Sequence, residues 1–130
     1  MLGLNVFFAG VSGVFLVGLA AYGAHGSGDA LARPAYFEVA WQIHAVHTAA
    51  LLALGMCRRP NLWLHAGYWL LMGGAICFSG SLYGRSFGWW DESSIVTPVG
   101  GLMLVAGWFA LAISGLYRLG YSSPSHKAED

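Results

Sequence analysis

Charged residues are scarce in this sequence. Lysine and arginine total 6, aspartate and glutamate total 6, and together they make up 9% of 130 residues, whereas a soluble domain carries about 25%. A chain that is also 57% hydrophobic is typical of a membrane protein. Its net charge of zero leaves no basic stripe to follow a phosphate backbone, so nucleic-acid binding is excluded.

The sequence also lacks the residue sets of common reaction and metal sites. Its two cysteines, Cys57 and Cys77, lie in apolar segments and not in a spaced framework, which predicts buried free thiols and neither a disulfide nor a zinc site. No nucleophile, base and orienting residue form a recognisable set, and no glycine-rich loop resembles a phosphate-binding motif. We therefore expect no enzyme activity and no bound cofactor.

Four long apolar segments predict an all-α polytopic membrane protein, a four-helix transmembrane bundle. Each segment is close to the ~20 residues that cross ~30 Å of hydrocarbon. The first could be a signal peptide, but residues 1–8 lack lysine and arginine and the apolar run exceeds the ~7 to 15 residues of a signal core, so we expect a retained span. The expected spans are residues 3–24, 35–56, 62–83 and 95–117, within a single domain, 1–121, that precedes a polar tail, 122–130.

Local signals predict where these helices begin and end. Gly23 and the glycines after it are expected to end the first helix, and Pro34 to open the second. Residues 58–61 form a link so short that the second and third helices must be an antiparallel hairpin, with Asn61 as the cap of the third. Thr97 and the proline after it predict a cap and first turn for the fourth helix.

Basic residues are unevenly divided between the two ends of the spans. Four spans place both termini on one side, and cytoplasmic loops carry the excess of lysine and arginine. The side of the termini has more basic residues, which predicts cytoplasmic termini. Arg58, Arg59, Arg118 and Lys127 lie on that side, and Arg33 and Arg85 lie on the other.

The second segment carries ionisable side chains into a sequence otherwise apolar enough to cross a membrane. Such residues are costly in hydrocarbon unless they face a partner or a wet cavity, so they mark places of assembly or activity. At ~1.5 Å and ~100° per residue, His44 and His47 lie near the midplane, and Glu38 points away from His47. We expect Glu38 to face the outer loops, near His25 or Arg33, and the two histidines to face neighbouring helices.

Each polar side chain has a structural and a functional interpretation. The spacing of His44 and His47 fits a metal or haem, but two histidines fall short of the three or four protein ligands of zinc, so interhelical hydrogen bonding is favoured. Glu38 could carry a proton if buried, but a helix-end charge is favoured. Ser79 and Ser81 could line a pore, although serine in a membrane helix more often bonds to its own backbone. The candidate functional residues are His25, Glu38, Gln42, His44, His47, Ser79, Ser81 and Thr97.

Small residues recur four positions apart in several segments. This spacing lets helix backbones approach closely where lipid removes the usual hydrophobic drive. It predicts a compact, left-handed bundle. The pairs are Ala9 and Gly13, Ala75 and Ser79, Gly80 and Gly84, and the longer series is Ala106, Ala110 and Ser114.

Motifs in or beside all four segments carry a family resemblance. They are Gly23-Ala24-His25-Gly26, Phe37-Glu38-x-Ala40 leading to His47, Phe78-Ser79-Gly80-Ser81-Leu82-Tyr83, and Thr97-Pro98-Val99-Gly100-Gly101 with Gly107-Trp108. Together they resemble the YgdD-like family of small membrane proteins, which includes the eukaryotic transmembrane protein 256. The resemblance implies four spans in the bacterial inner membrane, or alternatively in the mitochondrial inner membrane. It implies no activity, because none is established for the family.

Three hypotheses of function remain. The favoured one is a non-catalytic integral membrane protein, an accessory or assembly partner of a larger membrane complex. Its partners would be the lipid bilayer and other membrane subunits or a second copy of the chain. The alternative is a conduit for protons or a small solute that uses the midplane histidines. The third is a haem or metal-binding redox protein that uses His25, His44 and His47.

Overall fold

Four α-helices make up the part of the protein that the structure describes. The computed structural model describes residues 2–25, 34–90 and 94–121, and this part of the chain contains no strand. The helices are α1 (Leu2–His25), α2 (Pro34–Gly55), α3 (Leu62–Ser86) and α4 (Val96–Tyr121). The expected all-α, four-helix fold is confirmed, whereas the predicted polar tail lies outside the described residues.

Three helices are long and apolar enough to cross a membrane. They contain the segments Gly3–His25, Leu62–Ser86 and Val96–Gly120. With 22 residues α2 is also long enough, but it is not among the three. Its glutamate, glutamine and two histidines reduce its apolar character. For α2 to cross the membrane as expected for residues 35–56, these polar side chains therefore need hydrogen-bond partners.

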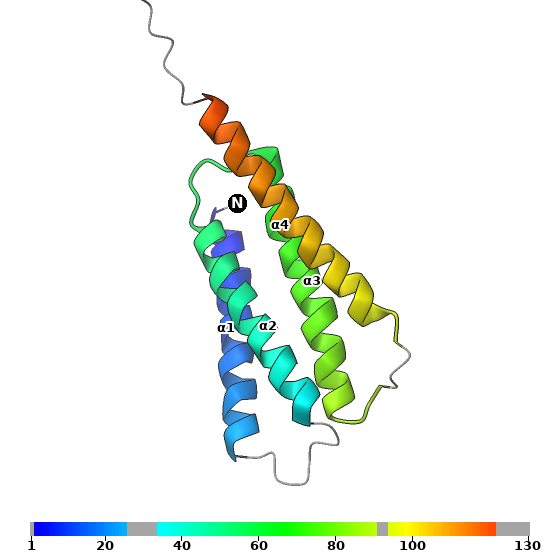
Figure 1. Ribbon diagram of the computed structural model, residues 1–130. Helices are drawn as coiled ribbons and strands as arrows, with labels where there is room; N and C mark the ends of the chain where they lie inside the picture. The colour runs from blue at the N-terminus through cyan, green and yellow to red at the C-terminus, as the bar shows by residue number, and fades with distance from the viewer. Residues whose placement is uncertain (1, 26–33, 91–93, 122–130) are drawn as a thin grey trace, which may run out of the picture.

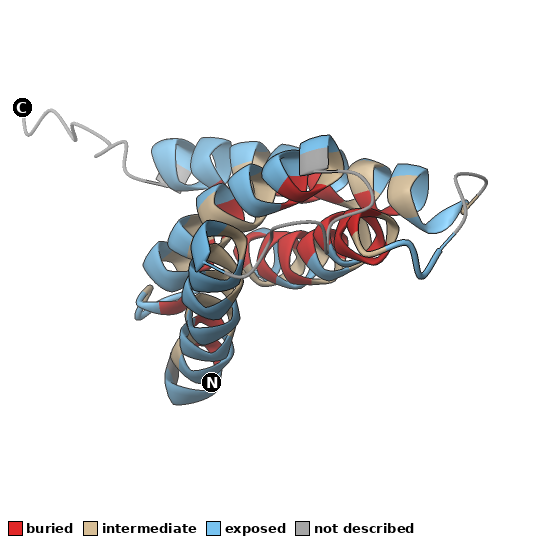
Figure 2. Ribbon diagram, turned by 90° about the horizontal axis from the view of Figure 1, so that it is seen from below, coloured by how far each residue is buried: buried red, intermediate tan, exposed pale blue. Residues whose placement is uncertain are grey.

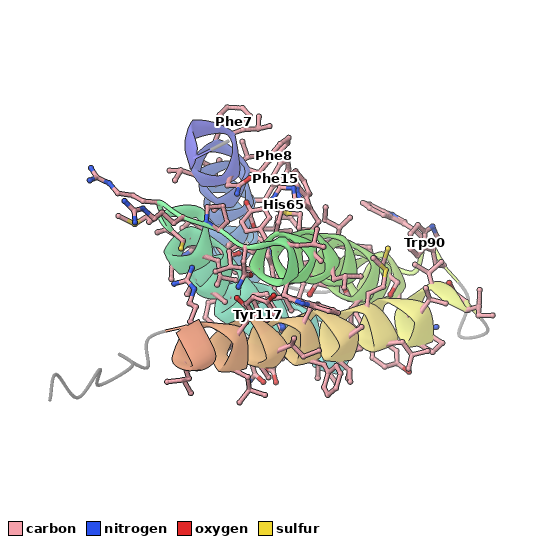
Figure 3. All side chains as sticks on the ribbon, turned by 90° about the horizontal axis from the view of Figure 1, so that it is seen from above. Phe7, Phe8, Phe15, His65, Trp90 and Tyr117 are labelled. Carbon is pink, nitrogen blue, oxygen red and sulfur yellow. The ribbon has the colours of Figure 1, made fainter. Side chains whose placement is uncertain are left out.

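The helices pack in the order of the chain. Each lies mainly against the next, so α1 and α4 are the two flanks and α3 lies between α2 and α4 (Figure 1). Figure 2 shows that buried positions gather along α3 and on the sides of the helices that face it. On the flanks, Phe7 and Phe15 of α1 and Tyr117 of α4 are all more than half exposed (Figure 3). This open arrangement leaves much apolar surface to be covered by lipid or by other proteins.

The start of α1, the α2–α3 link and the end of α4 lie at the same end of the molecule (Figure 1). Asn61 joins the α2–α3 link to α4, because its Oδ1 accepts 2.8 Å hydrogen bonds from the Leu64 backbone nitrogen and from Ser114 Oγ. Arg118 of α4 donates to the Arg59 carbonyl at 2.9 Å. The predicted hairpin and the Asn61 cap are confirmed. Which end faces the cytoplasm stays a prediction.

Glycines bring α3 and α4 into backbone contact. A Cβ on Gly100 would lie 2.5 Å from the Phe78 backbone nitrogen, and one on Gly74 would lie 2.9 Å from that of Leu104. Contacts this short leave no room for any side chain. Close packing through small residues was predicted, but these two glycines were not among the predicted positions.

The predicted small-residue pairs are only partly correct. Ala9, Ala110 and Ser114 are buried as expected. Ala106 is exposed, and a Cβ on Gly80 would meet nothing within 4 Å, so the packing predicted for these two residues is wrong. Contacts along a helix alternate between spacings of three and four residues. Residues spaced strictly four apart therefore move around the helix and leave its buried face.

Two helix ends also differ from the prediction. α1 continues two residues past Gly23 to His25, and a Cβ on Gly23 would lie 2.7 Å from Phe37 Cε1, so this glycine makes room for α2. Gly26 and Gly28, the other glycines of the predicted helix end, lie outside the described residues. α4 begins one residue before Thr97. Ser94 Oγ accepts from the Val96 backbone nitrogen at 3.3 Å, and the hydroxyl of Thr97 bonds to α3 instead. The cap role predicted for Thr97 is therefore wrong.

Candidate functional site in the membrane-spanning helices

His47 joins α2 to α4. Its Nδ1 donates to the Ile43 carbonyl at 2.7 Å, and its Nε2 accepts from Trp108 Nε1 at 3.2 Å. Because an indole nitrogen can only donate, Nε2 carries no hydrogen and the imidazole is neutral. The His47 side chain is buried, and its ring meets that of Trp108 edge-to-face at 6.0 Å. The expected hydrogen bond from His47 to another helix is confirmed.

His44 joins α2 to both α1 and α3. Ser12 Oγ lies 2.9 Å from His44 Nε2 and 2.7 Å from Thr48 Oγ1. The Tyr83 hydroxyl lies 3.5 Å from His44 Nδ1, which is a weak contact. We call Thr48, Ser12, His44 and Tyr83 the polar chain. The expectation that His44 faces neighbouring helices is confirmed.

Ser79 and Ser81 of α3 have different surroundings. Ser81 Oγ donates to the Phe78 carbonyl at 2.9 Å and accepts from Thr97 Oγ1 at 2.6 Å. Ser79 is 2% exposed, and its Oγ has no hydrogen-bond partner among the described residues. Two residues turn a helix by ~200°, so the two hydroxyls point in nearly opposite directions. The expected bond to the helix backbone is confirmed for Ser81 and wrong for Ser79.

The remaining candidates lie on the outside. His25 at the end of α1 is exposed, as are Glu38 and Gln42 of α2. The Glu38 carboxylate and the Gln42 amide have no hydrogen bond or ion pair within residues 2–25, 34–90 and 94–121. The pairing predicted between Glu38 and His25 is therefore not formed. Arg33, the other expected partner, lies outside the described residues.

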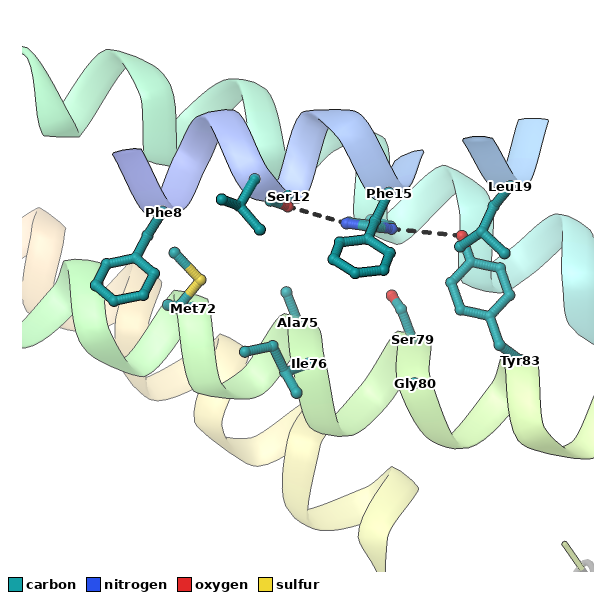
Figure 4. Close-up of a pocket in the computed structure, with 12 residues that line it drawn as sticks. Phe8, Ser12, Phe15, Leu19, Met72, Ala75, Ile76, Ser79, Gly80 and Tyr83 are labelled. Carbon is teal, nitrogen blue, oxygen red and sulfur yellow. Dashed lines mark hydrogen bonds between the residues drawn. The ribbon is translucent and has the colours of Figure 1, made fainter. Parts of the chain in front are cut away.

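A groove runs between α1 and α3 (Figure 4), and His44 of α2 also lines it. It encloses about 350 Å³, opens on one side, and has no charged side chain in its lining. Figure 4 shows the Ser79 hydroxyl directed into the space between the two helices. The walls are mainly apolar, with Phe8 and Phe15 on α1 and Ile76 on α3. The polar lining consists of Ser12, His44, Ser79 and Tyr83.

Sequence reasoning missed several partners of the candidate residues. Ser12, Tyr83 and Trp108 complete the contacts of the two histidines. Tyr68, which is fully buried, donates to the Asn5 carbonyl of α1 at 2.6 Å. A signal was available, because buried tyrosine and tryptophan usually find a hydrogen-bond partner. The sequence alone did not say which helix would supply it.

The hydrogen bonds of His47 leave neither of its ring nitrogens free to bind a ligand. The described residues contain no group of three or more histidine, cysteine, aspartate or glutamate side chains that could hold a metal. A metal on His47 would have to displace either the Ile43 carbonyl or Trp108, because both ring nitrogens are hydrogen-bonded. What the arrangement provides is a set of neutral polar groups that join all four helices.

These helices and their contacts define a small all-α membrane protein whose inward histidines hydrogen-bond to neighbouring helices. Residues 19–101 match the family described as Protein of unknown function (DUF423). The UPF0382 inner membrane protein YgdD of Escherichia coli K12 is 36% identical over 124 residues, covering 92% of this chain and 94% of the relative. No solved structure matches.

Two further relatives extend the comparison to other bacteria. A UPF0382 membrane protein of Haemophilus influenzae is 35% identical over 110 residues, covering 78% of this chain and 85% of the relative. One of Staphylococcus epidermidis is 30% identical over 114 residues, covering 85% and 93%. The chain therefore belongs to this family of membrane proteins, as the sequence motifs indicated. It is a protein of the bacterial inner, or cell, membrane.

Proposed function

We propose that the protein is a non-catalytic accessory or assembly partner of a larger membrane complex, and that it binds its partner through the outside of α2. The observation that carries the proposal is the exposure of Glu38 and Gln42. Gln42 lies eight residues from the start of α2, which is ~12 Å along the helix. Hydrocarbon offers no hydrogen bonds, so an uncovered amide or carboxylate there is costly. A partner helix with polar groups would remove this cost.

The same side of α2 suits the close approach of another helix. Ala49 and Ala53 are exposed, and they fall within about 20° of Gln42 around the helix. Small residues let backbones approach until van der Waals contacts and interhelical hydrogen bonds form. We call Glu38, Gln42, Ala49 and Ala53 the outer face of α2.

A non-catalytic role is supported by how the inward polar groups are used. His47 has both ring nitrogens bonded, and Ser81 bonds to Thr97 and to its own helix. Groups held in this way fix helix packing and are not available to a substrate. The polar groups left over lie on the outer face of α2 and in the groove.

A photo-crosslinking amino acid at Ala49 tests the proposal, with the same amino acid at Ala112 of α4 as the matched control. Both alanines are exposed. In intact membranes we expect the Ala49 derivative to form a discrete adduct with another membrane protein, while the Ala112 derivative reacts with lipid. Equal adducts from both positions would contradict a specific partner. An adduct of two identical chains would replace it with self-association.

Substitutions on the same face separate partner binding from folding. Gln42→Leu removes the uncovered amide and Ala49→Leu obstructs close approach, so both should reduce co-purification of the partner in mild detergent. Neither should lower the thermal stability of the purified chain, because both side chains are exposed. Ala112→Leu is the control and should retain the partner. A variant that keeps its partner despite Gln42→Leu would count against this surface.

A second candidate function, a conduit for protons, is favoured by the polar chain. Its groups follow one another from Thr48 through Ser12 and His44 to Tyr83, and a neutral histidine can pass a proton between its two nitrogens. The test is proton flux into liposomes that contain the purified protein. A conduit predicts flux that His44→Leu abolishes, whereas an accessory protein predicts no flux above that of empty liposomes.

A further inference from the structure

The groove between α1 and α3 has the cross-section of a single chain. It extends from Phe8 to Leu19 on α1 and from Met72 to Tyr83 on α3, which is ~16 Å along either helix. A volume of about 350 Å³ over that length corresponds to roughly 20 Å² in section. A helix with side chains is ~10 to 12 Å across, or roughly 80 to 110 Å². A single hydrocarbon chain therefore fits inside the groove, whereas a protein helix could place only its side chains there.

The polar groups in the groove indicate the chemistry of this occupant. Ser79 is almost completely buried, and its hydroxyl lacks a partner among the described residues although it points into the groove (Figure 4). The Tyr83 hydroxyl has only the weak 3.5 Å contact with His44. A mainly apolar site with a few convergent polar groups is typical of small-molecule binding. No charged side chain lines the groove, so nothing in its lining would pair with a charged group.

The depth of Ser79 separates a lipid-soluble molecule from an ordinary phospholipid. The middle of α3, which runs from Leu62 to Ser86, falls at Gly74, so Ser79 lies ~7 Å from the midpoint along the helix. The hydrocarbon core extends ~15 Å to each side of its midplane. A charged headgroup would stay outside that region, while a single carbonyl or hydroxyl oxygen can enter it if it is hydrogen-bonded.

We propose that the groove between α1 and α3 binds one uncharged, lipid-soluble molecule, a single aliphatic or isoprenoid chain that carries a carbonyl or hydroxyl oxygen, and that the Ser79 hydroxyl hydrogen-bonds this oxygen. The chain lies along Phe8, Phe15 and Ile76. The site is separate from the outer face of α2. This proposed binding site goes beyond the accessory role and does not depend on that role.

Three probes of equal chain length isolate the role of the oxygen: 2-tridecanone, 1-tridecanol and tridecane. Each is added to the delipidated protein in mild detergent, and the midpoint of thermal unfolding is measured. Binding to the folded state raises this midpoint, by about 4 to 8 °C when the probe is at roughly ten times its Kd. We expect the ketone or the alcohol to bind more tightly than the alkane. Equal shifts from all three probes would overturn the proposal.

Ser79→Ala removes the proposed hydrogen bond and should weaken binding of the oxygenated probe about 2- to 10-fold. Its matched control is Ser81→Ala, in the same helix, because that hydroxyl faces α4 and bonds to Thr97. The control should retain the preference for the oxygenated probe even if the protein becomes less stable. A preference that survives Ser79→Ala would overturn the assignment of this residue.

Gly80→Leu tests the groove itself. Gly80 lines the groove, and a Cβ there meets no atom within 4 Å, so a larger side chain fills empty space without displacing the fold. The variant should remain folded and lose the response to all three probes. Gly115→Leu, which also meets nothing within 4 Å and lies on α4, should keep it. Unchanged binding in Gly80→Leu would refute the site.

Native mass spectrometry of the protein, purified without delipidation, distinguishes the sources of the bound chain. One bound molecule with the mass of an uncharged oxygenated lipid, absent from Gly80→Leu, is the expected result. A phospholipid in its place, or a second copy of the protein that Gly80→Leu removes, would overturn the proposal.

Discussion

Replacing His47 tests whether its hydrogen bonds fix the packing of α2 on α4. His47→Leu removes both of its bonds, to the Ile43 carbonyl and from Trp108 Nε1. His47→Gln keeps a side-chain carbonyl that can accept from the indole. Trp108→Phe removes the donor and leaves His47 Nε2 without its partner. The three variants therefore examine the same contact from both sides.

The two bonds contribute unequally. The Ile43 carbonyl also accepts the backbone hydrogen bond of the α-helix from residue 47, so losing the imidazole bond does not leave it unpaired. The Trp108 indole N–H has no such second hydrogen-bond partner inside hydrocarbon. Side-chain hydrogen bonds in a bilayer contribute ~0.6 kcal/mol on average and up to ~1.7 kcal/mol, and an unpaired buried group costs about 1 to 3 kcal/mol. We expect His47→Leu to lower the free energy of unfolding by about 1 to 2 kcal/mol and His47→Gln by less than about 1 kcal/mol.

The assay is thermal unfolding in mild detergent followed by far-ultraviolet circular dichroism, which does not depend on indole fluorescence. A change of 1 kcal/mol should move the midpoint by about 3 to 6 °C. In a double-mutant cycle, His47→Leu and Trp108→Phe should be less than additive, because either one removes the shared bond. Trp69→Phe is the control, since Trp69 also donates to a histidine, His65, but in an exposed pair. It should lower the midpoint less.

Fully additive effects of His47→Leu and Trp108→Phe would refute the proposed contact. A glutamine variant as unstable as the leucine variant would show that accepting from the indole is not what His47 contributes. If His47→Gln instead remained as stable as wild type while losing cellular function, His47 would act in proton transfer, because an amide does not titrate near neutral pH.

Four further predictions concern other contacts and the orientation in the membrane. Tyr68→Phe leaves the protein folded but removes the donor to the α1 carbonyl, and thermal unfolding should show a loss of about 0.5 to 1.5 kcal/mol. Gly100→Ala places a Cβ against the α3 backbone and should cost about 1 to 3 kcal/mol, whereas Gly115→Ala, in open space, should be neutral or stabilising. Arg118 donates to Cys57 Sγ and lowers the pKa of that thiol, so alkylation of Cys57 should reach its plateau at lower pH than in Arg118→Leu. With cytoplasmic termini, an impermeant thiol reagent should label Cys57 in inverted vesicles and not in intact cells; the reverse would overturn the orientation.

Much of the fold could be predicted because the signals are local. A run of apolar residues long enough to cross a membrane indicates a helix whatever its neighbours are. Asn61 caps α3 as predicted, because capping depends only on residues within one turn. Thr97 has the same residue chemistry but bonds to Ser81 of α3 instead. Its role depends on where another helix lies, and no local pattern contains that information.

The residues of the candidate site could be predicted from the sequence, but their hydrogen-bond partners could not. His47 was expected to bond to another helix, but its partner, Trp108, is 61 positions away and depends on how α2 crosses α4. Ser79 and Ser81 could not be told apart, because the sequence does not show which side of α3 is covered by α4 and which faces the groove. The groove itself arises because α1 packs on α2 and not closely on α3.

The polar residues of α2 fall into two sets that point in opposite directions, and the physical consequences differ. The inward set is bonded to Ser12 of α1, Tyr83 of α3 and Trp108 of α4, which explains how α2, the helix that is not among the three apolar spans, is held among the other three. The outward set, Glu38 and Gln42, gains nothing from this chain's described residues. His44 and Gln42 are ~200° apart around the helix, so the groove and the outer face of α2 lie on separate surfaces. A substitution that prevents the lipid-soluble molecule from binding in the groove should therefore leave the partner bound. A substitution that releases the partner should leave this molecule bound in the groove. If either change abolished both, the two proposals would reduce to a single shared site.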